Sequence, residues 1–343
     1  MKRVLVINAG SSSVKCSLFH GEKEWHFEGK DFGILDQLRD QQIDLIGHRV
    51  VHGGQKFRQT TFLTKAVEEE IASLSFLAPL HNPISLRGIK EARHRFPSLH
   101  QYAVFDTAFH VTLPPVAYTY AGPYDWPERG IRKYGFHGIS YSYIASMIKE
   151  KRSVVCHLGS GASLCALLDG RSMDTTMGFS PLDGLMMGSR CGAIDPSIPL
   201  YLTLNENIFP SRVEEILNFE SGLLAISGVS AEMVEVEEAA KSGNKRAEFA
   251  IELFVYKFQQ QLAQMVSALG GIDSLVFTAG IGEHSPAMRN RLCPSYLGIK
   301  LDQTKNDAQE RIISARDSSA TVYVIPTREE WQIAQECLKM DRF

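Results

Sequence analysis

The stretch VLVINAGSSS at residues 4–13 decides the fold, because it joins an apolar run to a turn of small polar residues. Two further segments are built the same way: VVCHLGSG at residues 154–161 and LVFTAGIGE at residues 275–283. Each apolar run predicts a buried β-strand, and each turn of small residues allows backbone N–H groups to approach a ligand closely. Three such turns in one chain indicate a polyphosphate that is held by several loops.

The first two of these segments also resemble each other. Residues 7–18 align without gaps on residues 156–167, which places Gly10 on Gly159 and Cys16 on Cys165. Both copies have the order strand, glycine turn, strand. This repeat predicts two halves that are built on the same β-hairpin and hold a phosphate between them.

Strand and helix patterns alternate along the chain, which predicts the α/β class. Apolar runs at residues 103–105 and 322–325 predict further buried strands. An apolar stripe at helical spacing predicts a long helix over residues 245–269, which Gly270 and Gly271 end. Shorter helices are predicted over residues 67–76, 84–95, 211–217, 231–241 and 329–339.

The composition is typical of a globular protein. The 343 residues suffice for one large domain or two ordinary ones, and no apolar stretch is long enough for a transmembrane helix. The formal net charge of -3 argues against nucleic acid as a partner. The apolar run near the N-terminus ends too early for a signal peptide, and the six scattered cysteines form no CxxC pair. We therefore expect a cytoplasmic protein with reduced thiols and without a membrane partner.

Several common nucleotide and hydrolase motifs are absent. The sequence has no GxxxxGK[ST] segment, so it is not a P-loop enzyme, and residues 280–282 lack the third glycine of a dinucleotide fingerprint. Neither an HExxH segment nor a nucleophile-elbow serine is present.

Two arginines and one aspartate are candidates for a site. Arg49 lies in GHRVVHGG at residues 47–54, and Arg190 lies in a glycine-rich segment at residues 178–192. Two guanidinium groups facing one phosphoryl group are a recurring electrostatic arrangement. Asp106 ends a predicted buried strand, where ligands bind in α/β folds. The structural alternatives are a surface arginine at a strand end and a helix N-cap.

Two histidines and one glutamate are further candidates. His137 follows Phe136 between two glycines, which would let a ligand approach, although a structural histidine is the alternative. His81 lies in the rigid loop LAPLHNP at residues 77–83, where a hydrogen-bonded turn is the alternative. Glu329 opens the last predicted helix, where glutamates often serve only the helix dipole.

Taken in order, these segments resemble the acetate kinase family, the acetate and propionate kinase branch of the actin/hexokinase/Hsp70 superfamily. The resemblance spans nearly the whole chain. The matching segments are INAGSSSVK (7–15), GHRVVHGG (47–54), LAPLHNP (77–83), VFDTAFH (104–110), RKYGFHG (132–138), HLGSGAS (157–163), MGFSPLDGL (177–185), SRCGAIDP (189–196), FTAGIGEHS (277–285) and IPTREE (325–330).

The resemblance implies two related ribonuclease-H-like (actin-like ATPase) domains with an active-site cleft between them. The first domain would span residues 1–150 and be completed by the C-terminal helix at residues 329–343. The second, at residues 151–328, would bind the nucleotide and form a homodimer. The implied reaction is reversible transfer of the ATP γ-phosphoryl group to acetate, giving acetyl phosphate and ADP, with Mg²⁺ or Mn²⁺ as the metal.

The resemblance also assigns roles to individual residues. Arg49 and Arg190 would hold the carboxylate and the phosphoryl group, and His137 would donate to the latter. Asp106 and Glu329 would be the essential acidic pair, with Asn8 and Glu329 near the metal. Residues that would bind the nucleotide and its phosphates are Ser11, Ser13, Lys15, His81, His157, Ser160, Gly161, Gly280, Ile281 and Gly282.

The acetate pocket implied by the resemblance consists of Arg49, Val51, Leu80, Phe136 and Pro181. A smaller residue at position 51 would admit a longer acyl chain, whereas valine favours acetate. One methylene discriminates by only about 1–3 kcal/mol, so propionate should also react.

The chain departs from the family pattern at three places. Ser160 replaces the usual asparagine of the second phosphate loop, and Arg328 replaces the usual asparagine beside Glu329. Arg328 would either weaken Mg²⁺ binding or add a phosphate contact. The stretch between Leu18 and Gly47 is also shorter than usual. These departures leave three alternatives: a propionate or butyrate kinase, a pyrophosphate-dependent kinase, and a catalytically weak regulatory protein that binds nucleotide.

Overall fold

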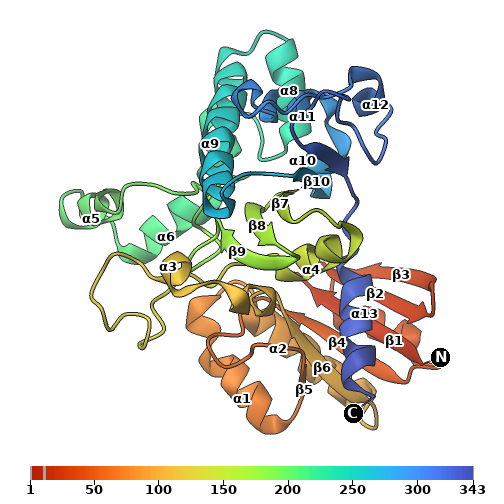
Figure 1. Cartoon of the computed structure of the whole chain (residues 1–343). Helices are drawn as coiled ribbons and strands as arrows, with labels where there is room; N and C mark the ends of the chain where they lie inside the picture. The colour runs from red at the N-terminus through yellow and green to blue at the C-terminus, as the bar shows by residue number, and fades with distance from the viewer. Residues whose placement is uncertain (1, 11–12, 343) are drawn as a thin grey trace. The chain divides into compact units, whose positions relative to one another are not determined.

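The computed structural model describes residues 2–10 and 13–342, which form two compact units (Figure 1). The first unit contains the described residues of Met1–Thr112, Pro123–Tyr143 and Arg328–Phe343. The second contains Leu113–Gly122 and Ile144–Thr327. The last helix of the chain therefore belongs to the same unit as the first strand.

A six-stranded sheet forms the centre of the first unit, in the order β3-β2-β1-β4-β6-β5. Strand β1 pairs antiparallel with β2 and parallel with β4, and β4 pairs parallel with β6. The strands are β1 (Arg3–Ala9), β2 (Val14–His20), β3 (Lys23–Gly29), β4 (Leu45–Val50), β5 (Thr61–Phe62) and β6 (His100–Phe105).

Both faces of this sheet are covered by helices. Successive side chains of β1 point to opposite faces, so each face contributes to a different core. Leu5 and Ile7 pack with the 3-10 helix η1 (Phe32–Leu38) and with α2 (Asn82–Arg95). Val4 and Val6 pack with α13 (Glu329–Met340). A strand buried on both faces accounts for the uninterrupted apolar run that opens the sequence. The other helices that begin in this unit are α1 (Lys65–Ser73), η2 (Ser75–Leu77), η3 (Ala108–Thr112) and α4 (Gly138–Met147).

The second unit repeats this strand arrangement in a five-stranded sheet of order β11-β10-β7-β8-β9. As in the first sheet, three antiparallel strands are followed by two parallel ones, since β7 pairs parallel with β10 and β10 with β11. The strands are β7 (Arg152–Leu158), β8 (Ala162–Leu168), β9 (Arg171–Thr175), β10 (Ser274–Thr278) and β11 (Thr321–Val324). The shared order confirms the α/β class and the two related halves.

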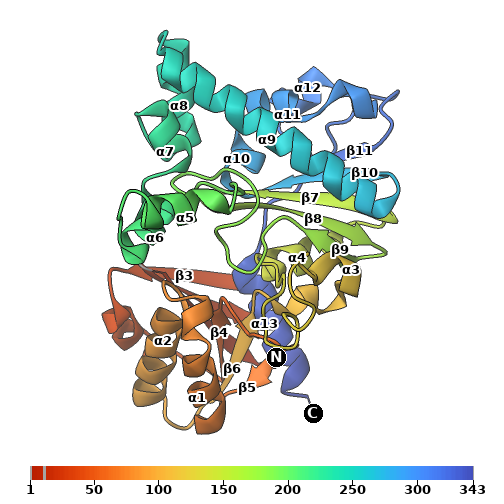
Figure 2. The same cartoon turned by 90° about the vertical axis from the view of Figure 1, so that its left-hand side faces the viewer.

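Helix α9 crosses the strands of the second sheet (Figure 2). It spans Lys245–Leu269, as its apolar stripe predicts, because Asn244 caps its first turn and Gly270 ends it in a left-handed conformation. The other helices of this unit are α3 (Pro115–Tyr118), α5 (Ser197–Leu204), α6 (Pro210–Phe219), α7 (Gly222–Ser227), α8 (Met233–Lys241), α10 (Ala279–His284), α11 (Pro286–Leu292), η4 (Ser295–Leu297) and α12 (Gln303–Asp307). Of the helices in the described residues, none has the length and apolar character needed to cross a membrane.

Two details of the fold differ from the prediction, one in the repeat and one in the third segment. Ala9 pairs with Val14 in the first hairpin, but Leu158 pairs with Ala162 in the second, so the second turn is one residue shorter than a gap-free alignment requires. The prediction of a third turn at residues 279–283 is wrong. These residues form most of helix α10, and only Ala279 keeps a left-handed backbone, with φ of 63°.

Candidate active site

Arg49 and Asp106 form the centre of a charged cluster in the first unit. Arg49 lies near the end of β4, and Asp106 directly follows β6. The two strands are parallel and adjacent, so their carboxyl ends meet at one edge of the sheet. Arg49 donates from Nη2 to Oδ2 of Asp106 at 2.8 Å and from Nε to both carboxylate oxygens at 3.2 and 3.3 Å. Asp106 is 1% exposed, so its charge lies away from water and is compensated by this guanidinium.

Helix α13 brings two glutamates to the same guanidinium. Glu329 Oε2 lies 3.4 Å from Nη1 of Arg49. Burial lowers the pKa of Arg49, but the neighbouring Asp106 and Glu329 outweigh that effect and hold the pKa above its usual range. Burial raises the pKa of Glu329, and Glu330 raises it further, whereas Arg49 acts in the opposite direction. The cluster thus holds more carboxylate than cation, which suits a site that also receives a metal ion.

Asn8 and Lys15 lie on the strands that flank the first turn. They face each other across the β1–β2 pair, and Asn8 Nδ2 donates to Oε1 of Glu330 at 2.9 Å. The turn closes with a hydrogen bond from Gly10 N to the carbonyl oxygen of Ser13 at 2.9 Å. Ser11, which the sequence predicts to contact phosphate, lies outside the described residues.

His137 is held beside Asp106 by a strained backbone. Its φ is 57°, a left-handed conformation that is uncommon for a residue with a side chain. The next residue, Gly138, donates its N–H to the carbonyl oxygen of Asp106 at 3.0 Å. A Cβ at Gly138 would lie 2.0 Å from that oxygen, so only glycine permits the contact. The requirement at position 138 and the left-handed conformation of His137 fix the backbone of His137 next to Asp106.

The residues expected around acetate divide between buried and exposed positions. Val51 and Phe136 are buried in the first unit, whereas Leu80 is 40% exposed on the loop before α2. His81 occupies the N-cap position of α2. Asn82 ties this loop to the chain after β4, because its side chain accepts from the N–H of His52 at 3.1 Å and donates to the carbonyl oxygen of His52 at 3.0 Å.

Arg190 and Pro181 are brought together in the second unit. Nη1 of Arg190 donates to the carbonyl oxygen of Pro181 at 3.1 Å and contacts Sδ of Met187 at 3.6 Å. Burial lowers the pKa of Arg190. Within the part of the chain that the structure describes, no carboxylate forms an ion pair with Arg190. A partly buried guanidinium without a counter-ion is a suitable group for an incoming anion.

The second phosphate turn and the predicted adenosine segment lie at the same edge of the second sheet. Strands β7 and β10 are parallel, and His157 pairs with Thr278 directly before the two segments. A cavity of about 530 Å³ adjoins them and is lined by Gly159, Ser160, Gly280 and Ile281, among others. His157 is 7% exposed, whereas Ser160 lies at the surface of the cavity. The remaining predicted glycines, Gly161 and Gly282, belong to the same two segments.

Arg328 is paired away from Glu329. Its Nη2 lies 2.7 Å from Oε2 of Glu24 on β3, and its guanidinium lies over the ring of Trp331. The carboxylate of Glu24 therefore compensates the positive charge that Arg328 brings to this position.

The family model described as "Acetokinase family" matches residues 30–335. The acetate kinase of Protochlamydia amoebophila is 42% identical over 398 residues and aligns with 99% of this chain and 99% of that protein. The acetate kinase of Nostoc punctiforme is 47% identical over 319 residues, covering 90% of this chain and 78% of that protein. The 398 aligned positions exceed the 343 residues of this chain, so the first relative has at least 55 residues that this chain lacks (398 minus 343).

Solved structures agree with the sequence comparison. An acetate kinase from Porphyromonas gingivalis superposes with a TM-score of 0.90 at 34% identity, covering 99% of this chain and 100% of that chain. A propionate kinase from Francisella tularensis superposes with a TM-score of 0.93 at 36% identity and the same coverage.

Proposed function

Because the chain belongs to the acetokinase family, we propose that it transfers the γ-phosphoryl group of ATP to acetate, giving acetyl phosphate and ADP, and catalyses the reverse reaction. The observation that carries this proposal is the cluster of Arg49, Asp106 and Glu329 at one edge of the first sheet. It combines a guanidinium that can bind an anion with carboxylates that can hold a metal ion, and phosphoryl transfer uses both kinds of group.

The reaction needs little proton transfer. A carboxylate oxygen of acetate attacks the γ-phosphorus, the bond from phosphorus to the β,γ-bridging oxygen breaks, and ADP leaves with that electron pair. Acetate is already ionised at neutral pH, so no general base is required. The barrier lies in bringing two anions together, and it falls when cations and placed donors neutralise the developing charge.

The candidate residues divide this task. We propose that Arg49 binds the acetate carboxylate and that Asp106 positions Arg49 through its two-pronged contact. His137 donates to the transferring phosphoryl group, and Arg190 supplies the second guanidinium. Ser13, Lys15 and the turn after β1 contact phosphate oxygens in this proposal.

The acidic side of the cluster suits Mg²⁺. This ion prefers oxygen ligands and is commonly held by one or two carboxylates together with substrate phosphates and water. No group of three metal-binding side chains occurs among the residues described, which is compatible with an ion held largely by phosphate and water. We propose that Glu329 and Asn8 would hold the ion, which would neutralise negative charge on the phosphates when bound.

The nucleotide is proposed to bind in the second unit. The cavity of about 530 Å³ is large enough for a nucleoside, and Ser160 and Gly280 line it at the two segments predicted to contact phosphate and adenosine.

A hydroxamate assay tests the proposal directly. Purified protein is incubated with Mg²⁺, ATP and acetate, propionate or butyrate, and acyl phosphate is trapped with hydroxylamine. We expect product with acetate and less with propionate, because buried Val51 leaves little room for a longer chain. Absence of product with every acid would leave a regulatory nucleotide-binding role. Arg190→Ala and Glu329→Ala should abolish turnover, with folding checked by circular dichroism.

We further propose a cytoplasmic homodimer that associates through the second unit. Helix α5 and the segment after it expose large apolar side chains that water does not favour. These are Ile198, Leu200, Tyr201, Leu204 and Phe209. A cytoplasmic location agrees with six free cysteines, all of which lie in the described residues.

A further inference from the structure

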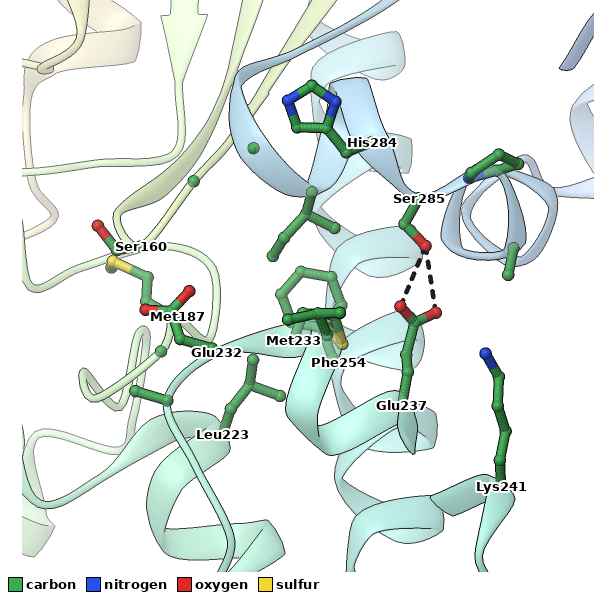
Figure 3. A pocket seen from close by; sticks show the side chains of 18 residues that line it. Ser160, Met187, Leu223, Glu232, Met233, Glu237, Lys241, Phe254, His284 and Ser285 are labelled. Carbon is green, nitrogen blue, oxygen red and sulfur yellow. Dashed lines mark hydrogen bonds between the residues drawn. The ribbon is translucent and has the colours of Figure 1, made fainter. Parts of the chain in front are cut away.

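A second cavity lies in the first unit and is separate from the one in the second unit, which Figure 3 shows with Ser160 and Glu237 among its labelled residues. The second cavity has a volume of about 200 Å³. Its walls come from the segment before β5, from β6 and η3, from the start of α4 and from α13. Among the described residues that line it, none is assigned above to phosphate, acetate or metal. A cavity of this size suits a molecule smaller than a nucleotide.

Two polar side chains in its wall are almost fully buried. Gln332 and Thr60 are each 5% exposed. Nε2 of Gln332 donates to Oγ of Ser142 and to Oε1 of Glu336, both at 3.0 Å. Because a carboxylate only accepts, the second contact fixes the nitrogen of the amide, and the amide oxygen accepts no hydrogen bond from a described residue. The hydroxyl of Thr60 also has no hydrogen-bond partner in the described ranges. Since buried polar groups are normally paired, a polar ligand would supply what both lack.

The cavity also carries one charge of each sign, on different elements. Arg58 lines it from the segment of Thr60, is exposed, and forms no ion pair with a residue that the structure describes. Glu336 follows Gln332 by four residues on α13, so the two share one face of the helix. Oε1 of Glu336 also accepts from Nζ of Lys339 at 2.8 Å, whereas no described residue bonds to Oε2. One wall therefore offers donors and the other offers acceptors.

This combination selects the class of ligand. A simple anion at Arg58 would also meet the carboxylate of Glu336, and a simple cation at Glu336 would meet Arg58. A molecule with both charges satisfies both walls, with its carboxylate toward Arg58 and Thr60 and its ammonium toward Gln332 and Glu336. The rest of the lining is apolar and consists of Val104, Phe105, Ala108, Phe109 and Ile139. We propose that the cavity binds an α-amino acid with an apolar side chain, such as leucine.

The position of the cavity makes such a ligand an effector. Gly138 lines the cavity, and its N–H donates to the carbonyl oxygen of Asp106 at 3.0 Å. Helix α13 begins at Glu329, three residues before Gln332. The ligand would therefore contact two elements that hold the proposed catalytic residues. The effector role rests on the proposed kinase function, whereas the binding site does not.

Calorimetric titration of the full chain with L-leucine tests the site. All titrations contain acetate, which keeps the proposed acetate pocket occupied. Leucinamide lacks the carboxylate and 4-methylpentanoate lacks the ammonium group, so we expect each to bind about tenfold or more weakly than leucine. Arg58→Gln should weaken leucine binding to a similar extent and leave leucinamide binding unchanged. Glu336→Gln should weaken leucine binding and spare 4-methylpentanoate. The matched control is Arg316→Gln, which changes an exposed arginine of the second unit and should bind leucine like the parent.

The outcomes separate the site from its effect. Failure of leucine to bind, or equal leucine affinities in R58Q and R316Q, would overturn the site. Folding of each variant is checked by circular dichroism, and equal binding of leucine and leucinamide to the parent would overturn the site without any variant. Saturating leucine should change the kcat of acyl phosphate formation several-fold. Leucine that binds and leaves kcat and KM unchanged would overturn the effector role alone. Absence of acyl phosphate with and without leucine would instead overturn the kinase function.

Discussion

At the scale of single residues, Arg49 joins Asp106 and Glu329, which approach it from different segments of the chain. Arg49→Ala would leave the buried carboxylate of Asp106 without its guanidinium. Breaking such a pair costs about 3–5 kcal/mol of unfolding free energy. We expect that loss in urea unfolding and a fall in kcat of about a hundredfold or more. Arg49→Lys keeps the charge but not the two-pronged contact, so it should recover stability more than activity. An Arg49→Ala protein as stable as the parent would contradict this assignment.

His48 and His110 give the protein a predictable sensitivity to acid. Burial lowers the pKa of each imidazole to about 4, from an ordinary value near 6.5. Between these values the unfolded chain binds protons that the folded protein does not, so the unfolding free energy falls as the pH decreases from 6.5 to 4. The loss is on the order of 3 kcal/mol for each histidine.

Urea unfolding at several pH values measures this effect. His110→Gln keeps a donor for the carbonyl oxygen of Phe136, which lies 3.0 Å from His110 Nε2, but cannot titrate. It should reduce the slope of stability against pH, whereas His94→Gln, at an exposed position, should not. Equal slopes for both variants would contradict the role of burial.

Some residues of the site carry a local signal and others do not. Arg49, Asp106 and His137 stand beside glycines or at strand ends, so their positions could be predicted. Glu330 was missed as a partner of Asn8, because 322 residues separate the two and only the fold brings them together. The clamp between Asn82 and His52 was missed for the same reason. A run of two glutamates at the start of the last helix was the available signal for Glu330.

At the scale of elements, the position of α13 depends on the lack of a side chain at Gly47. A Cβ at this residue of β4 would lie 2.7 Å from Sγ of Cys337 and 2.8 Å from Cγ2 of Ile333, both on α13. Gly47→Ala should therefore displace the helix that carries Glu329. We expect a loss of about 1–3 kcal/mol in unfolding free energy and a lower kcat. Adding Cys337→Ala removes one of the two clashes and should recover part of both. No recovery would mean that Ile333 alone sets the spacing.

Helices whose apolar pattern, cap and end residue agree in the sequence were predictable. Those that depend on a contact made by another side chain were not. Helix α9 has an apolar stripe, a capping asparagine and a terminating Gly270, and its bounds match the prediction. Residues 279–283 were predicted as a turn because they are small residues that follow an apolar strand. They form α10 in the structure, where the side chain of Glu283 accepts from the N–H of Ala279 at 2.7 Å.

At the scale of the whole molecule, the exposed apolar side chains of the second unit predict self-association. Leu204, at the end of α5, is 73% exposed, and Phe209 is 79% exposed. Replacing both with aspartate should convert a dimer into a monomer in analytical ultracentrifugation. The matched control is Val116→Asp, which changes another strongly exposed side chain, on α3. If the double variant sediments like the parent, this surface does not form the dimer.

The placement of α13 against β1 has a consequence for synthesis on the ribosome. Ile333, Ala334 and Cys337 complete the core that Val4 and Val6 begin. Strand β1 must therefore wait for α13, while the second unit lies wholly within the chain between them. We expect the second unit to become protease-resistant on stalled nascent chains before the first does. The first unit would then mature after the second, although its first strand leaves the ribosome before it.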